Sequence, residues 1–260
     1  MITNRQFSLA LDELVELKPD EAPAQPQPMA ARPTLSSVLS EIGSLPREAL
    51  FLGVASDGLP VLLNLHDAAP GSLLIVSEAG AGKTDFLKML ALGVQQTHRS
   101  GAVQFGVITK RPDEWDDVEA GAHHVGVFPV SENQASEFIH SLSTWAHINR
   151  NSHKFVLLLI DDLESITRLD SGTLQDLRWL LLRGTSHGVW PILTLDAERY
   201  GQVLDWIPMF RTRIFGRIED DSVAAALGGD KASALNQLAA GVQFSLRENG
   251  QWLRFWLPSC

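Results

Sequence analysis

Residues 73–87 read LLIVSEAGAGKTDFL, an apolar run followed by a glycine-rich turn and a stretch of helix formers. The P-loop pattern is G-x-x-x-x-G-K-[ST], in which backbone N–H groups surround phosphate oxygens, the lysine reaches the β and γ phosphates, and the hydroxyl holds Mg²⁺. Gly80, Gly82, Lys83 and Thr84 match this pattern. The sequence therefore predicts an ATP-binding loop, and an ordinary glycine-rich turn between a strand and a helix is the alternative.

Ser77 replaces the first glycine of the pattern. That position ends the strand, and a small residue can follow the same path if its φ angle stays negative. The glycines nearer the phosphate are the ones at which a side chain would collide with the ligand. We expect the substitution to be tolerated and the nucleotide to be bound by Ser77, Glu78, Ala79, Gly80, Ala81, Gly82, Lys83 and Thr84.

A P-loop requires a second buried strand that ends in a carboxylate for Mg²⁺. Residues 154–166, KFVLLLIDDLESI, supply an apolar strand followed by Asp161 and Asp162. Because the carboxyl ends of parallel strands share one edge of a sheet, we expect Asp161 to lie beside Thr84 and to hold the metal with it. A helix cap is the alternative role for the two acids.

Asp162 is predicted to polarise the attacking water, and Lys83 is the second predicted catalytic residue of the chain's own site. Many motors carry glutamate at the position of Asp162, and aspartate is shorter by about 1.5 Å. A displacement near 1 Å costs on the order of a hundredfold in rate. We therefore expect nucleotide binding to survive this substitution and fast turnover to be lost.

Apolar runs rich in β-branched residues alternate with helical patterns along the chain. This alternation predicts an α/β fold of the RecA-like P-loop NTPase type, with a mostly parallel sheet, helices on both faces and β-hairpins near both ends. The hairpins are expected over residues 49–65 and 241–258, with turns at Asp57-Gly58 and Asn249-Gly250. The strands are expected at 72–76, 102–109, 124–130, 154–160, 189–195 and 211–218, and the helices at 83–97, 132–148, 172–186 and 220–227.

Three segments are expected before and within the globular part. Residues 1–18 form an amphipathic helical tail, because Phe7, Leu11, Leu14 and Val15 recur at helical spacing. Residues 19–34 are a linker rich in Pro, Ala and Gln, and residues 35–260 are the P-loop ATPase domain. The tail helix either docks on a partner or a neighbouring subunit, or frays.

Composition restricts the possible partners and location. The formal net charge of −10 argues against nucleic-acid binding through overall charge, so DNA would have to meet a local basic strip or a ring of subunits. No apolar run reaches the roughly 18 residues of a membrane span, and no secretory signal is evident. The single cysteine, Cys260, excludes internal disulfides and fits a cytoplasmic protein.

Four blocks in the same order and spacing resemble the FtsK-type branch of the FtsK/HerA P-loop ATPases, over about residues 50 to 257. The blocks are residues 52–84 with the P-loop, 103–118 (VQFGVITKRPDEWDDV), 181–197 (LLRGTSHGVWPILTLDA) and 207–222 (IPMFRTRIFGRIEDDS). The resemblance implies a DNA translocase motor domain that works on double-stranded DNA. It also implies a homo-oligomer, hexameric in this family.

The resemblance implies further site residues and shows departures. Arg183, Arg213 and Arg217 match arginines of the family, and one of them would reach a neighbouring subunit's nucleotide as an arginine finger. We take Arg183 and Arg213 as the catalytic candidates, and pairing with the surplus acids is the alternative. The family's Arg and its Thr-Gln pair, which senses the γ-phosphate, are replaced by Thr185, Leu195 and Asp196.

Two functions are compatible with these observations. The first, which is the leading hypothesis, is an ATP-binding, Mg²⁺-dependent motor that assembles as a ring and moves duplex DNA. The second is a degenerate nucleotide-binding module of a larger assembly, resembling secretion-type ATPases, in which ATP cements an interface with little or no hydrolysis. The substitutions at residues 77, 162, 185 and 196, together with the acidic charge, favour the second function.

Overall fold

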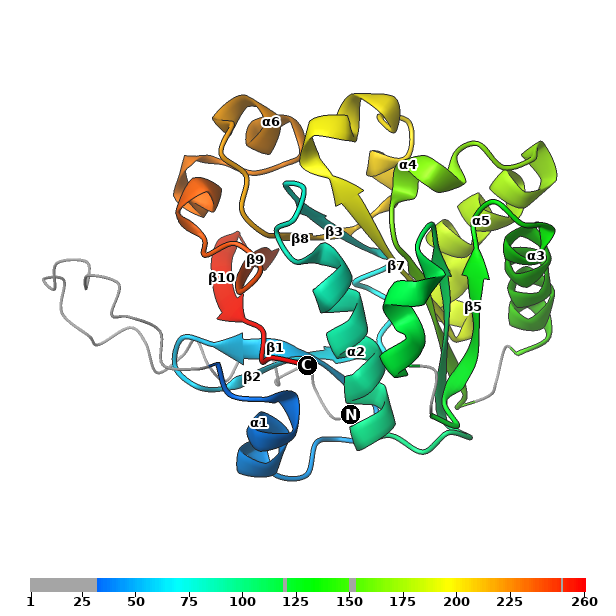
Figure 1. Ribbon diagram of the computed structural model, residues 1–260, viewed down its shortest axis with the longest axis horizontal. Coiled ribbons are helices and arrows are strands. Elements are labelled where there is room, and N and C mark those ends of the chain that lie inside the picture. The colour runs from blue at the N-terminus through cyan, green and yellow to red at the C-terminus, as the bar shows by residue number, and fades with distance from the viewer. Residues whose placement is uncertain (1–31, 119–120, 150–152, 249) are drawn as a thin grey trace, which may run out of the picture. The chain divides into compact units, whose positions relative to one another are not determined.

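A ten-stranded sheet runs through the described part of the chain (Figure 1). The computed structural model describes residues 32–118, 121–149, 153–248 and 250–260, and Thr34–Cys260 form one compact unit. The predicted tail helix, nearly all of the predicted linker and Asn249 of the predicted last turn lie outside the described residues. Among the helices that are described, none is long and apolar enough to cross a membrane.

Six neighbouring strands of this sheet are parallel, which confirms the predicted α/β class. The strand order across the whole sheet is β2-β1-β10-β9-β8-β3-β7-β6-β4-β5. The parallel strands are β3 (Leu73–Ser77), β4 (Val103–Thr109), β5 (His124–Pro129), β6 (Phe155–Ile160), β7 (Val189–Asp196) and β8 (Thr212–Phe215). β3, β4, β6 and β7 have near-continuous apolar sequences and are almost wholly buried, as expected for strands covered on both faces.

The remaining strands form the two predicted hairpins and extend the sheet in antiparallel fashion. These strands are β1 (Ala49–Ala55), β2 (Pro60–Asn64), β9 (Gln243–Glu248) and β10 (Gln251–Trp256). β9 pairs with β8, and β10 pairs with β1, with Val54 opposite Trp256. Two hairpins from opposite ends of the domain are therefore joined into one sheet, a contact that local sequence patterns do not reveal.

Helices cover both faces of the sheet. Helix α2 (Lys83–Thr97) packs on one face, while α3 (Asn133–Ile148) and α5 (Ser171–Arg183) pack against each other on the other face. The α-helices are completed by α1 (Leu35–Ile42), α4 (Leu163–Ile166) and α6 (Asp221–Ala226). The short 3₁₀ segments are η2 (Pro112–Val118), η3 (Gly184–His187), η4 (Ala197–Gln202), η5 (Ile207–Met209), η6 (Lys231–Ser233) and η7 (Leu235–Gln237).

The predicted helix over residues 172–186 ends earlier than expected. α5 stops at Arg183, and the chain continues as the 3₁₀ segment η3 up to Gly188, whose φ of 81° closes the turn. α1 was not predicted, and its first turn is capped by Thr34, whose hydroxyl accepts the Ser37 N–H at 3.2 Å.

Strand β3 divides the core into two clusters. Leu73 and Ile75 pack with α2 on one side, whereas Leu74 and Val76 pack with α3 and α5 on the other. All of β3 is buried, so the loop that follows it starts from a fixed strand. Because β3, β7 and β6 are parallel neighbours in that order, their carboxyl ends lie at one edge of the sheet.

Candidate nucleotide-binding site

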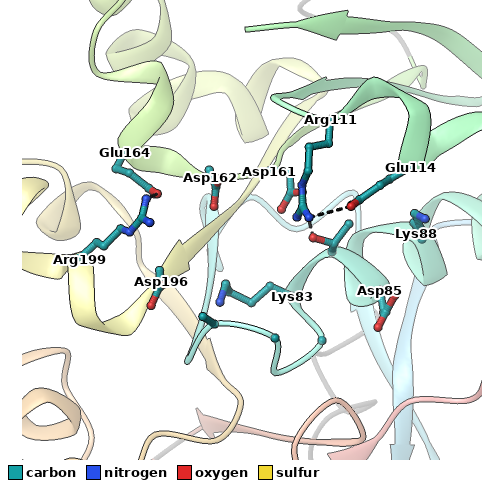
Figure 2. A pocket seen from close by; sticks show the side chains of 14 residues that line it. Lys83, Asp85, Lys88, Arg111, Glu114, Asp161, Asp162, Glu164, Asp196 and Arg199 are labelled. Atoms are coloured by element: carbon teal, nitrogen blue, oxygen red, sulfur yellow. Dashed lines mark hydrogen bonds and ion pairs between the residues drawn. The ribbon is translucent and has the colours of Figure 1, made fainter.

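A cavity of about 530 Å³ lies at this edge of the sheet (Figure 2). It brings together the predicted loop, the amino end of α2, the segment after β4, and the ends of β6 and β7. Its lining is strongly charged, with six acidic and four basic side chains. The lining residues are Ala79, Gly80, Gly82, Lys83, Thr84, Asp85, Lys88, Arg111, Glu114, Asp161, Asp162, Glu164, Asp196 and Arg199.

The loop depends on glycine at two positions. Gly80 and Gly82 have φ angles of 70° and 81°, in the left-handed region that side chains with a Cβ rarely adopt. A Cβ at Gly82 would also lie 2.6 Å from the Cα of Gly241. Gly82 then starts α2, so the free N–H groups of the first helical turn face the cavity that Lys83 and Thr84 line.

Ser77 is fully buried at the end of β3 and does not have a positive φ angle, as the sequence argument requires. Its hydroxyl donates to the Glu78 carbonyl at 3.2 Å. Gly216 makes room for it, because a Cβ at Gly216 would lie 2.8 Å from the Ser77 Cβ. The first P-loop glycine is thus replaced at a position where a neighbouring glycine supplies the missing space.

Lys83 is nearly buried and folds back onto the loop. Its Nζ donates to the carbonyls of Ser77 and Glu78 at 3.0 and 2.7 Å. Burial lowers the pKa of Lys83, and the surrounding acids oppose this shift, Asp196 most strongly. The ammonium group is thus held by two neutral carbonyls, from which an anionic ligand in the cavity can draw it.

Thr84 and Asp161 lie side by side, as predicted from the shared edge of the sheet. The Thr84 hydroxyl donates to Asp161 Oδ2 at 2.9 Å, and the Thr194 hydroxyl donates to Oδ1 of the same carboxylate at 2.9 Å. Burial raises the pKa of Asp161, and the two hydroxyl groups oppose this shift. The carboxylate is therefore held in one orientation from both sides.

These two residues fit a Mg²⁺ ion that is bound together with phosphate. Mg²⁺ in nucleotide sites takes one or two protein oxygens and completes its shell with phosphate and water. The Thr84 hydroxyl and the Asp161 carboxylate supply such oxygens beside the phosphate loop. No group of three or more His, Cys, Asp or Glu side chains in the described ranges is placed to hold a metal by itself, so the phosphates would be needed as ligands.

Asp162 lines the cavity in a strained backbone conformation. Its φ and ψ angles are 82° and 92°, and its N–H donates to the Thr194 hydroxyl at 2.8 Å. Its Oδ2 is 3.1 Å from the ammonium group of Lys110. The predicted base thus reaches the site with its carboxylate already paired to a cation.

Three residues of the site were not recognised from the sequence. Thr194 binds both acids from β7, which lies between β3 and β6 in the sheet. Arg199 donates to Glu164 Oε1 at 2.8 Å, and both side chains line the cavity. In the sequence, these residues were marked only by lying within a few positions of a predicted strand end. That position does not reveal which side chain reaches the site.

The candidate arginine fingers lie outside this cavity. Arg183 is exposed at the end of α5, and its carbonyl accepts from Ser186 and His187. Arg213 is half-buried on β8, where its guanidinium donates to the carbonyls of Leu227 and Ile207 at 2.8 and 3.2 Å. Its side chain lines a second cavity of about 450 Å³. Neither arginine contacts the loop of its own chain.

Arg217 approaches the loop through its backbone. Its carbonyl accepts the Glu78 N–H at 3.0 Å, while its guanidinium pairs with Glu219. The Glu78 carboxylate in turn accepts the Glu219 N–H. Glu78 is therefore a structural part of the loop that anchors it to the segment after β8, and it does not line the cavity.

No protein family model and no curated protein sequence matches this chain. Solved structures do match it. Thermomonospora curvata EccC (ATPases 2 and 3), in complex with a signal sequence peptide, has a TM-score of 0.68 at 14% identity over 88% of this chain and 43% of its own. EssC (ATPases 2 and 3) from Geobacillus thermodenitrificans has a TM-score of 0.66 at 15% identity over 91% of this chain and 48% of its own.

The pCW3 conjugation coupling protein TcpA, in its monomer form with ATPγS, has a TM-score of 0.66 at 14% identity. The match covers 88% of this chain and 70% of TcpA. The chain spans less than half the length of the EccC and EssC structures. At these identities the likeness concerns the fold, and it shows that the chain has the fold of a P-loop ATPase.

Proposed function

We propose that this chain binds ATP with Mg²⁺ in the cavity, hydrolyses it, and moves double-stranded DNA as one subunit of a homo-oligomeric ring. The observation that carries the nucleotide part is the 2.9 Å hydrogen bond between Thr84 and Asp161 beside the glycine-rich loop. An ordinary strand-to-helix turn has no need of a buried carboxylate from another strand against its first helical hydroxyl. This pair is the arrangement that a magnesium–phosphate ligand requires.

The residues of the chain then have distinct tasks. The amides of the loop residues that line the cavity (Ala79, Gly80 and 82–84) bind phosphate oxygens. Lys83 leaves the carbonyls of Ser77 and Glu78 for the β and γ phosphates. Thr84 and Asp161 hold the metal, which when bound neutralises part of the phosphate charge. Asp162 orients the attacking water and accepts its proton once Lys110 releases the carboxylate.

The motor and ring parts of the proposal rest on the resemblance of the four sequence blocks. TcpA, which has the same fold, is a conjugation coupling protein. A cytoplasmic location fits the single cysteine, and the solved structures with this fold include the cytoplasmic domains of EssC and of Thermomonospora curvata EccC. Arg183 is exposed and lies outside the cavity of its own chain. In a ring, its side chain is therefore available to a nucleotide bound by a neighbouring subunit.

A second candidate function is favoured by the charges around two acids of the cavity. Asp162 is paired with Lys110 at 3.1 Å, and Asp196 is the acid that acts most strongly on Lys83. Both place charge where rapid hydrolysis would be hindered. In this function the nucleotide is a structural ligand of a larger assembly, such as the secretion ATPases whose fold the chain shares.

One paired measurement separates the two functions. MgATP binding is measured by calorimetry, and phosphate release is measured with and without duplex DNA on the unaltered chain and on Lys83→Ala. Binding with DNA-stimulated turnover that Lys83→Ala abolishes supports the motor. Binding and thermal stabilisation without phosphate release support the structural module. Absence of any heat with MgATP on folded protein would refute both.

A further inference from the structure

The cavity has few cations for the phosphates that it would hold. Its lining contains the acids Asp85, Glu114, Asp161, Asp162, Glu164 and Asp196 against Lys83, Lys88, Arg111 and Arg199. Asp196 ends β7 directly opposite Ser77 of β3, and it acts on Lys83 more strongly than any other acid. A γ-phosphate beside Lys83 would therefore meet the negative charge of Asp196 unless another cation joined it.

Arg199 is positioned to be that cation. It lies on η4, three residues after Asp196, and lines the same cavity as Lys83. Half of the Arg199 side chain is exposed, so packing does not enclose it on all sides. Planar guanidinium groups bind phosphate oxygens in pairs, which makes arginine suited to this task.

In this structure Arg199 is held by Glu164. Its Nη1 is 2.8 Å from Glu164 Oε1, and Figure 2 shows the two side chains pointing toward one another. Glu164 is 4% exposed, and its second oxygen, Oε2, is buried without a hydrogen-bond partner. Burying a carboxylate with one unsatisfied oxygen costs free energy, and the charge of the Arg199 guanidinium offsets part of that cost.

We propose that Arg199 is the residue that distinguishes ATP from ADP at this site, and that Glu164 holds it away from the phosphates until a γ-phosphate is bound. The proposal rests on the proposed function, because it requires nucleotide in the cavity. The γ-phosphate competes with Glu164 for the guanidinium, while ADP offers no anion at that position. Arg199 thus takes the place of the polar pair that Leu195 and Asp196 replace.

Lys110 can neutralise Glu164 after Arg199 has moved to the phosphate, and it also contacts Asp162. Its ammonium group is 3.1 Å from Asp162 and 3.7 Å from Glu164. When Arg199 turns to the phosphate, Lys110 remains as the cation that neutralises Glu164. As Lys110 moves toward Glu164, the Asp162 carboxylate loses its partner and becomes available to the attacking water. Recognition of the triphosphate and release of the base are then one event.

The test compares the affinities of MgADP and of MgATPγS, a slowly hydrolysed triphosphate, by calorimetry on the unaltered chain and on four variants, three single and one double. Arg199→Gln is expected to weaken MgATPγS binding by about tenfold or more, the range of a hydrogen bond to a charged group, and to change MgADP binding less than about twofold. Arg168→Gln, an exposed arginine outside the cavity, is the matched control and is expected to change neither.

Glu164→Gln supplies the reciprocal result. Freeing Arg199 is expected to strengthen MgATPγS binding several-fold, and this gain is expected to vanish when Arg199→Gln is also present. Circular dichroism and the unfolding midpoint verify that each variant is folded.

Each other outcome is decisive. If Arg199→Gln weakens both nucleotides equally, or neither, Arg199 does not recognise the γ-phosphate and the inference is wrong while the proposed function stands. A gain from Glu164→Gln that persists without Arg199 also overturns it. If neither nucleotide binds the unaltered chain, the proposed function itself fails.

Discussion

The two walls of the cavity are held in place by different means. The loop wall, residues 77–84, is set by its own backbone: a buried strand before it, two glycines with positive φ angles within it and a helix after it. The acidic wall, formed by Asp161, Asp162, Glu164 and Asp196 and backed by Thr194, is set by side chains from separate elements. The Thr194 hydroxyl, for example, binds both Asp161 and Asp162.

The contrast explains why one wall follows the P-loop pattern and the other departs from it. Backbone amides bind phosphate whatever the side chains are, so Ser77 can replace a glycine when Gly216 leaves it space. Side-chain positions have no such tolerance, because a changed residue removes the interacting group itself. Substitutions on the acidic wall therefore change the chemistry, whereas those on the loop wall change mainly the packing.

Removal of the loop wall's lysine is expected to have the largest effect. Lys83→Ala deletes the loop side chain that we propose bonds phosphate directly, and we expect MgATP affinity to fall by about a hundredfold, the upper range of a hydrogen bond to a charged group. Calorimetry measures the effect. Lys231→Ala, an exposed lysine outside the cavity, is the control. Unchanged affinity in Lys83→Ala would show that the loop does not bind phosphate as proposed.

The packing of the loop wall is tested at Gly216. A Cβ there would lie 2.8 Å from the Ser77 Cβ, so Gly216→Ala is expected to lower the free energy of unfolding by about 1–3 kcal/mol. Urea unfolding measures this change. Gly101→Ala, where a Cβ would meet nothing within 4 Å, is the control.

The double variant Ser77→Gly, Gly216→Ala is expected to lose less stability than the sum of the single changes, because the contacting Cβ is gone. Strict additivity would mean that Ser77 and Gly216 do not compensate each other.

On the acidic wall, Thr194→Val keeps the shape of the side chain and removes its hydroxyl. Asp161 then loses one of the two groups that orient it, and we expect about tenfold more Mg²⁺ to be needed for half-maximal ATP binding. Titration of nucleotide binding with Mg²⁺ measures this. Thr212→Val, whose hydroxyl bonds Pro70 outside the cavity, is the matched control. An unaltered Mg²⁺ dependence would remove Thr194 from the metal site.

Lengthening the side chain of Asp162, the proposed general base, is expected to have a smaller effect. Asp162→Glu adds about 1.5 Å of reach and should raise phosphate release several-fold if the rest of the site is competent. The same change should slightly lower the unfolding midpoint, because glutamate tolerates the φ angle of 82° less well than aspartate does. If turnover does not rise, the cause of slow hydrolysis lies in another residue of this wall. Asp196, which stands where the family has glutamine, would be the next residue to replace.

The buried acid of this wall also predicts a modest pH effect. Burial raises the pKa of Asp161 above its ordinary value of 3.8, so the carboxyl ionises at lower pH in the unfolded chain than in the folded chain. The stability of the metal-free protein relative to Asp161→Asn should therefore fall as the pH rises above that value, by about 1.4 kcal/mol per pH unit until the carboxyl of the folded chain has ionised. Unfolding midpoints at a series of pH values measure the difference, and a constant difference would contradict it.

Much of the fold followed from local patterns. The helix predicted over residues 83–97 is α2 with the same bounds, and the strand predicted over residues 189–195 is β7 with one residue more. The proximity of Thr84 and Asp161 also followed, because parallel strands end at one edge. Such features depend on the periodicity of a short segment or on a general rule of parallel sheets.

Other features of the site did not follow, since they depend on which elements become neighbours. Thr194 reaches Asp161 only because β7 is placed between β3 and β6, and strand order is not written in any one strand. Lys110, which follows β4, pairs with Asp162, which follows the neighbouring strand β6. Arg213, a predicted catalytic candidate, lines a second cavity instead. α1 also went unpredicted, because eight residues give only two turns of periodicity.

The glycine-rich loop, the strand that ends in two acids and the alternation typical of a parallel sheet could all be read from the sequence, because each is encoded by residues adjacent in the chain. The side-chain contacts around the acidic wall could not: Thr194 orients Asp161, Lys110 pairs with Asp162, and Glu164 binds Arg199. Those contacts join side chains that are distant in sequence, and their geometry exists only after the sheet has assembled its strands in order.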